Sequence, residues 1–308
     1  MMSSDDTDLS DEVCASCGIP AVDDVKLKDC NGGCDLVKYC SDICQELHRE
    51  QHEQECKKRK DMIQKRLAEI RDDKQLFTQP GMSYMGECPL CCLPLSVDVS
   101  KSITMSCCCK TICNGCCYAN EKRENEQGLK HRCAFCREPK PKSGEEVDKN
   151  IMNRIKKNDP AATTAMGKKS ERDGDYGKAL EYFTKAAELD DVDAHACLGN
   201  LYWEGKGVEN DMKKAIHHLE QAAIGGHTYA RYNLAGYEIM NARYERAAKH
   251  YIINANLGCN ESLKAIKVLF VQRVVSKDES TAALRGYQAA VNETMSAERE
   301  KAEAAKFV

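Results

Sequence analysis

The sequence predicts a multi-domain fold class: two small zinc-stabilised modules followed by an all-α helical-repeat solenoid. The chain has 308 residues and 20 cysteines, and all of these except Cys197 and Cys259 lie between Cys14 and Cys136. Most of them form pairs separated by two or three residues, the spacing of metal ligands on one short turn. The second half instead carries alanines at regular intervals, which is typical of stacked helical hairpins.

Composition and charge exclude several classes of protein. The net charge of −4 gives no bulk attraction to nucleic acid or to an anionic membrane. There is no run of about 18 apolar residues that could span a membrane. The polar, acidic start does not resemble a secretion signal. We therefore expect an intracellular protein of the cytoplasm or nucleus, where cysteines stay reduced and bind metal rather than forming disulfides.

Changes in composition divide the chain into successive segments. The predicted segments are an acidic disordered tail (1–12), a first cysteine cluster (13–56), a helical linker (57–86), a second cysteine cluster (87–138), a linker with Pro, Gly and charges (139–150) and helical repeats (151–308).

The first cluster offers its ligands in short pairs. They are Cys14 and Cys17, Cys30 and Cys34, Cys40 and Cys44, and His52 and Cys56. A structural zinc site takes four nitrogen or sulfur ligands, so these pairs suffice for two sites. Ser41 is a suitable cap for a helix that starts at Asp42, and the 44, 48, 52 and 56 positions would then share one helix face.

The segment YCSDICQELHREQHEQEC (39–56) resembles the MYND zinc finger, and the match extends over 14–56. The resemblance implies interleaved sites, in which the first and third pairs share one zinc ion and the second and fourth pairs share the other. It implies that His48 is a helix-face histidine rather than a ligand. It also implies that the finger binds short, often proline-rich, peptide segments of other proteins.

The second cluster contains three clean pairs and one triplet. The pairs are Cys88 and Cys91, Cys113 and Cys116, and Cys133 and Cys136, and the triplet is Cys107, Cys108 and Cys109. This pattern resembles a RING finger across 88–136, although Lys110 stands where a histidine ligand is usual. The resemblance implies that the first and third pairs share one zinc ion. The last pair would bind the other with two ligands from the triplet. Cys107 and Cys109 fit that spacing best, with Cys108 as an alternate.

Two sites in each module amount to about four zinc ions per chain. In RING-type ubiquitin ligases, an apolar residue inside the first pair and a cation after the last pair contact the conjugating enzyme. Leu90 and Arg137 occupy those positions here.

The helical half repeats with a period in the thirties. Alanine pairs eight residues apart recur at steps of roughly 32–36 residues; the pairs are Ala179 and Ala187, Ala215 and Ala223, Ala247 and Ala255, and Ala282 and Ala290. The stretch 194–227 resembles a Sel-one-like repeat, a relative of the tetratricopeptide repeat. We expect three to four hairpins with degenerate outer copies, and an ordinary helical bundle is the alternative.

Two functional hypotheses remain open at this point. The first is a protein–protein interaction scaffold that uses the finger, the RING-like module and the repeats. The alternative is a RING-type ubiquitin ligase in which the finger and repeats recruit the substrate; such an enzyme acts by positioning and has no catalytic residue of its own. A metalloenzyme is disfavoured because the sites look closed. Nucleic-acid binding is disfavoured because the basic run KKRK (57–60) has no interleaved aromatic residue.

Overall fold

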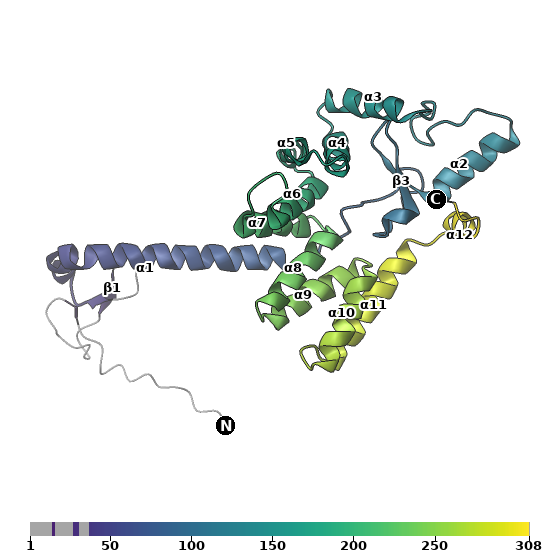
Figure 1. Cartoon of the computed structure of the whole chain (residues 1–308). Helices are drawn as coiled ribbons and strands as arrows, with labels where there is room; N and C mark the ends of the chain where they lie inside the picture. Colours follow the sequence, from purple (N-terminus) through teal and green to yellow (C-terminus); the bar gives the residue numbers. More distant parts are fainter. Residues whose placement is uncertain (1–13, 16–26, 31–36, 308) are drawn as a thin grey trace. The chain divides into compact units, whose positions relative to one another are not determined.

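The computed structural model describes residues 14–15, 27–30 and 37–307 (Figure 1). Two compact units make up the chain, Met1–Gln75 and Leu76–Val308. The predicted acidic tail lies outside the described residues. Among the helices that are described, none is both long and apolar enough to cross a membrane.

The first unit contains a short hairpin and the start of a long helix. Strand β1 (Lys28–Asp29) pairs antiparallel with β2 (Lys38–Tyr39), and helix α1 (Asp42–Leu76) follows directly. The Ser41 hydroxyl accepts a hydrogen bond from the Cys44 backbone N–H at 3.2 Å, which caps the helix as the sequence predicted. The helix is rich in charged residues and has no apolar stripe, as expected of a solvated helix.

The second unit begins with the second cysteine cluster. A 3-10 turn, η2 (Val99–Lys101), leads into β3 (Ser102–Thr104), which pairs antiparallel with β4 (Thr111–Cys113) and is followed by α2 (Asn114–Glu126). Few apolar side chains other than cysteines are fully enclosed here, chiefly Leu95 and Ile112. A core this small does not hold a module of this size together without another stabilising element.

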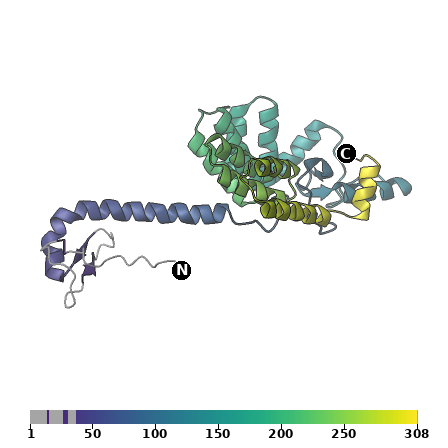
Figure 2. The same ribbon diagram turned by 90° about the horizontal axis from the view of Figure 1, so that it is seen from below.

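The remainder of the second unit is helical, and most of it is built from antiparallel hairpins (Figures 1 and 2). After α3 (Gly144–Ile155), the hairpins are α4 (Pro160–Arg172) with α5 (Tyr176–Ala187), α6 (Val192–Glu204) with α7 (Met212–Ile224), α8 (Thr228–Met240) with α9 (Tyr244–Asn256), and α10 (Asn260–Val271) with α11 (Lys277–Glu293). Each hairpin also packs on the next. The last helix is α12 (Ala297–Ala304). The predicted class, a small zinc-finger region followed by a helical-repeat solenoid, is confirmed.

Small residues allow the two helices of a hairpin to approach closely. A Cβ atom on Gly199 of α6 would lie 2.7 Å from Cγ of Leu219 on α7, and one on Gly167 of α4 would lie 2.5 Å from the Phe183 ring on α5. In the fourth hairpin the structure differs from the sequence prediction by one position, because Ala283 is fully buried whereas Ala282 is exposed.

The predicted helical linker, 57–86, is not free over its whole length. Helix α1 ends at Leu76, whose side chain is 4% exposed in a core cluster with α7 and α8. Arg231 of α8 is fully buried and donates to the carbonyl oxygens of Leu76 at 2.9 Å and of Ala223 at 2.6 Å. Further along, the Tyr84 ring stacks on His227 with 4.1 Å between ring centroids. The segment from 76 to 84 therefore packs on the repeats.

The boundaries expected around the second cluster also change. Helix α3 starts at Gly144, inside the predicted linker 139–150, and its Ser143 side chain accepts a hydrogen bond from the Glu146 N–H at 3.3 Å. At the other end of the chain, α12 packs on α2 of the cysteine module rather than on the repeats (Figure 2). The cysteine module and the repeats thus belong to one compact unit.

Candidate metal centres

In the first unit, the described ligands gather into the two groups implied by the interleaved pairing. The ligand atoms of Cys14, Cys40 and Cys44 all lie within 4.8 Å of one another, and so do those of Cys30, His52 and Cys56. The fourth predicted member of each group, Cys17 or Cys34, lies outside the described residues.

Helix α1 and the hairpin position these ligands. Cys44, His52 and Cys56 are spaced on one face of α1, while Cys30 and Cys40 directly follow β1 and β2. Sulfur–sulfur distances of 3.5 Å for Cys40 and Cys44 and 3.7 Å for Cys30 and Cys56 are those expected of thiolates sharing one ion. His48 belongs to neither group; its Nδ1 lies 3.0 Å from the Tyr39 hydroxyl, which is consistent with a helix-face histidine.

In the second unit, the cysteines form two groups of four. One group contains Cys88, Cys91, Cys113 and Cys116, and the other contains Cys107, Cys108, Cys133 and Cys136. In each, the four sulfur atoms lie within 4.8 Å of one another. The chain thus alternates between the groups, with the first and third pairs in one and the second and fourth in the other.

The structure places Cys108, rather than the expected Cys109, in the second group. The backbone of Cys109 turns into the left-handed region with φ of 53°, and its N–H bonds the Met105 carbonyl oxygen at 2.7 Å. Its side chain interacts with Arg154 of α3 instead. Two adjacent thiols therefore face the same group, an arrangement that the usual spacing of such ligands does not predict.

Two loops of the same shape carry the first and last pairs. The residue after each pair, Cys92 or Arg137, has a positive φ, 55° and 64° respectively. The N–H of Cys92 bonds the Cys88 carbonyl oxygen at 2.9 Å, and that of Arg137 bonds the Cys133 carbonyl oxygen at 3.1 Å. This tight turn directs both sulfur atoms of a pair toward one point, so the backbone is already shaped for a metal ion.

Buried polar groups on α2 hold the last loop in place. The Glu124 side chain is 4% exposed and accepts from the Arg132 N–H at 3.3 Å, while His131 lies 3.5 Å away. Burial would raise the pKa of Glu124, but these contacts hold it below its usual range. The Arg137 guanidinium donates to Asn120 Oδ1 at 2.6 Å. The sequence reasoning did not identify Asn120 and Glu124, because isolated polar residues on a charged helix carry no motif.

Leu90 and the two remaining cysteines of this module lie outside the ligand groups. Leu90 is 41% exposed in the loop between Cys88 and Cys91. Cys92 is exposed and Cys117 is buried, and neither belongs to a ligand group. Four thiols around one point make a closed site, the kind that stabilises a fold, whereas catalytic zinc keeps an open position. The donor sets therefore fit zinc in a structural role.

Comparison with known proteins supports two of the three parts of the chain. The family model of the MYND finger matches residues 14–56, and the Sel1 repeat model matches residues 165–191 and 192–227. The chain thus contains a MYND finger, which implies bound zinc, and Sel1 repeats, which generally mediate protein–protein interaction. The likeness of 88–136 to a RING finger remains a resemblance in sequence.

The similar curated proteins match over short stretches. An uncharacterized protein of Neisseria meningitidis is 46% identical over 46 residues, 15% of this chain and 10% of that protein. A protein of Helicobacter pylori named putative beta-lactamase HcpC is 48% identical over 56 residues, 18% of this chain and 19% of that protein. The chain therefore spans less than a fifth of the length of either relative.

Two solved structures are similar as well. A Sel1 repeat protein from Oxalobacter formigenes has a TM-score of 0.43 and 24% identity, covering 58% of this chain and 72% of that one. The antigen c5321 of uropathogenic Escherichia coli has a TM-score of 0.40 and 19% identity, covering 63% and 40%.

Proposed function

We propose that this chain is a zinc-dependent protein-interaction scaffold that holds about four zinc ions, two in each cysteine module. The observation that carries the proposal is the grouping of cysteines in the second unit into two closed clusters, in a chain that also has a helical repeat with an exposed aromatic surface. Closed thiol clusters stabilise a fold rather than perform chemistry. The function of the protein then depends on the surfaces that bind other proteins. We place it in the reducing interior of the cell, the cytoplasm or the nucleus.

The repeat surface that we assign to partner binding is an aromatic groove on α6 and α8. A cavity of about 420 Å³ lies there, lined among others by Trp203, Tyr229, Tyr232, Tyr237 and Met240. Tyr229 is 54% exposed and Met240 75% exposed. Tyrosine, tryptophan and methionine are enriched where proteins bind one another, because they offer large apolar area at low entropic cost.

Polar groups in the groove suit a peptide backbone. The side chains of Asn200 and Asn233 line the same cavity, and the Asn233 amide donates to Asn200 Oδ1 at 3.3 Å. An amide pair supplies both donors and acceptors to an extended segment. The occupant we propose is a short peptide segment of another protein.

Nothing among the described contacts favours the ligase alternative over the scaffold. An exposed Leu90 is compatible with either function. Arg137, the second residue assigned to a conjugating enzyme, already uses its guanidinium on Asn120 within the module.

Metal content tests the first half of the proposal. Elemental analysis of the full chain after dialysis should give about four zinc ions. About two ions per chain would mean that one of the two modules does not bind zinc as proposed, and none would refute the proposal altogether.

Peptide selection tests the second half. Peptides selected from a random library against the zinc-loaded chain should include a class whose affinity falls at least about tenfold in Tyr229→Ala combined with Tyr232→Ala. Leu284→Ala, which removes another exposed apolar side chain from α11, should leave their affinity unchanged. A library that yields no peptide sensitive to the groove would refute binding there.

A further inference from the structure

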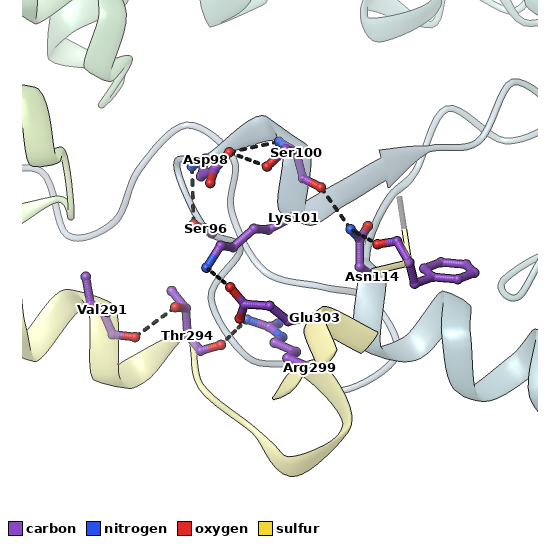
Figure 3. Close-up of polar contacts among 10 residues, drawn as sticks. Ser96, Asp98, Ser100, Lys101, Asn114, Val291, Thr294, Arg299 and Glu303 are labelled. Carbon is purple, nitrogen blue, oxygen red and sulfur yellow. Dashed lines mark hydrogen bonds and ion pairs between the residues drawn. The ribbon is translucent and has the colours of Figure 1, made fainter. Parts of the chain in front are cut away.

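The end of the chain is packed against one of the metal centres. Residues 296–307, which we call the C-terminal latch, comprise the Ser296 cap, helix α12 and the residues after it. The latch contacts η2 and α2 of the cysteine module, about two hundred residues earlier in the chain (Figure 3).

Arg299 is the centre of this contact. Its guanidinium donates to the carbonyl oxygens of Pro94 at 2.7 Å and Leu93 at 3.3 Å, in the loop that follows the first ligand pair. It also donates to the Cys91 sulfur at 3.5 Å and interacts with the Cys113 thiol. The same guanidinium donates to the Thr294 carbonyl oxygen at 2.7 Å, so Arg299 also bonds the chain just before α12.

The backbone of the latch fits the turn between two ligands. A Cβ atom on Gly115 would lie 2.7 Å from the Arg299 backbone nitrogen, so only glycine allows this approach. Gly115 stands between the ligands Cys113 and Cys116. The surface on which α12 packs is therefore the turn that carries the sulfur atoms of Cys113 and Cys116.

Flanking contacts complete the docking. The Asn114 amide donates to the Ser100 carbonyl oxygen at 2.8 Å and to that of Phe307 at 3.2 Å. The Lys101 ammonium lies 3.4 Å from the Glu303 carboxylate (Figure 3). Ala302 is fully buried. With 8 residues, α12 is too short to persist as an isolated helix in water.

We propose that the C-terminal latch docks only when the Cys88–Cys91–Cys113–Cys116 cluster holds its metal ion, and that Arg299 in turn retains the ion. Four thiolates around one divalent cation leave a net negative charge, which a guanidinium offsets through charge-assisted hydrogen bonds. Because coupling between two binding events is reciprocal, the ion promotes docking as much as docking retains the ion. Arg299 is here a positioning residue, since it acts on the metal through the sulfur atoms.

This inference rests on the proposed function only in taking the cluster as a zinc site. Hydrogen exchange measured by mass spectrometry on the full chain distinguishes a failure of this inference from a failure of the proposed function. With zinc bound, amides of 297–307 should be protected; after chelation their exchange should accelerate at least about tenfold, while α6 to α8 remain protected. Equal protection of the latch with and without zinc, in a chain shown by elemental analysis to bind zinc in this module, would overturn the inference alone. Absence of zinc from the module would overturn both proposals.

A pair of variants tests Arg299. Transfer of zinc to a colorimetric chelator should be about tenfold faster from Arg299→Ala, the loss expected for a hydrogen bond to a charged group. Lys301→Ala removes a cation from an exposed position of the same helix and should match the wild type. Equal rates for the two variants would refute the assignment of Arg299.

Gly115→Ala provides a second route that leaves Arg299 and all ligands in place. The added methyl group should prevent docking, expose the latch amides to exchange and accelerate zinc transfer. A Gly115→Ala chain with a protected latch would contradict the docking geometry. Protection of α6 to α8 in every variant shows that the rest of the unit remains folded.

Discussion

A buried histidine makes the repeat domain sensitive to acid. His250 on α9 is fully buried, and neither of its ring nitrogens has a hydrogen-bond partner among the described residues. The ring packs on Phe77 with 4.7 Å between centroids. Burial, reinforced by the charges of Arg231 and Arg246, lowers the pKa of His250 to about 3.

The sign and size of the effect follow from this shift. In the unfolded chain the histidine has a pKa of about 6.5. Between about pH 6.5 and pH 3, therefore, His250 is protonated in the unfolded state but not in the folded state. His250 therefore does not affect the free energy of unfolding above about pH 6.5, and within the window it lowers that free energy by about 1.4 kcal/mol for each pH unit. At pH 5 the loss amounts to about 2 kcal/mol.

His250→Leu should remove this contribution, because leucine fills a similar volume without titrating. We expect a variant at least as stable as the wild type at pH 7.5, since two unpaired nitrogens leave the interior. Urea unfolding followed by Trp203 fluorescence at pH 7.5, 6.0 and 5.0 measures the difference. The stability of the variant relative to the wild type should rise by about 2 kcal/mol over this range.

Comparing variant with wild type cancels acid effects that both share, such as loss of zinc or protonation of His218. Lys249→Leu is the matched control, because it places leucine at the neighbouring exposed position on the same helix. A constant difference between His250→Leu and the wild type from pH 7.5 to 5.0 would refute the reasoning.

Further predictions follow from the metal centres and the packing. Cys108→Ser should lower the zinc content by about one ion, whereas Cys109→Ser should retain all of it; the opposite result in elemental analysis would restore the assignment made from sequence. Gly199→Ala should destabilise the repeats by about 1–3 kcal/mol in urea unfolding because its methyl group meets Leu219, while Gly236→Ala, with no atom within 4 Å of its Cβ, should stabilise them by about 0.5–1 kcal/mol. Arg231→Met should cost about 1–3 kcal/mol by removing the buried hydrogen bonds that the guanidinium donates to the Leu76 and Ala223 carbonyl oxygens; an unchanged urea midpoint would contradict that capping role.

Spacing rules predicted most of the fold and which cysteines form ligand pairs. Cysteines separated by two or three residues can bind the same metal ion. Alanines that recur at a fixed period indicate helices in close contact. These signals are local, so one sequence suffices to detect them. The alternation between ligand pairs came from family resemblance, and the described residues gather in the same way.

The errors were of a different kind. The choice between Cys108 and Cys109 depends on the backbone of the loop between β3 and β4, where Cys109 has a positive φ. The choice between Ala282 and Ala283 depends on the phase of one helix. In both cases the two neighbouring residues are of the same type, so the sequence pattern fits either of them. The contact of Arg299 with the Cys91 loop spans over two hundred residues and uses one arginine among many exposed ones, so no pattern in the chain marks it.

The capping of Leu76 by Arg231 and the docking of α12 on the cysteine module together affect how this protein can change in evolution. Repeat arrays ordinarily gain or lose copies at their ends, because each copy contacts only its neighbours. Here Leu76, which precedes the repeats, is bonded to Arg231 of α8. Helix α12, which follows the repeats, packs on α2. Adding or deleting a hairpin would change the separation of these anchor points and detach one of them. A change in the number of hairpins is therefore expected to require a compensating change at one of these two contacts.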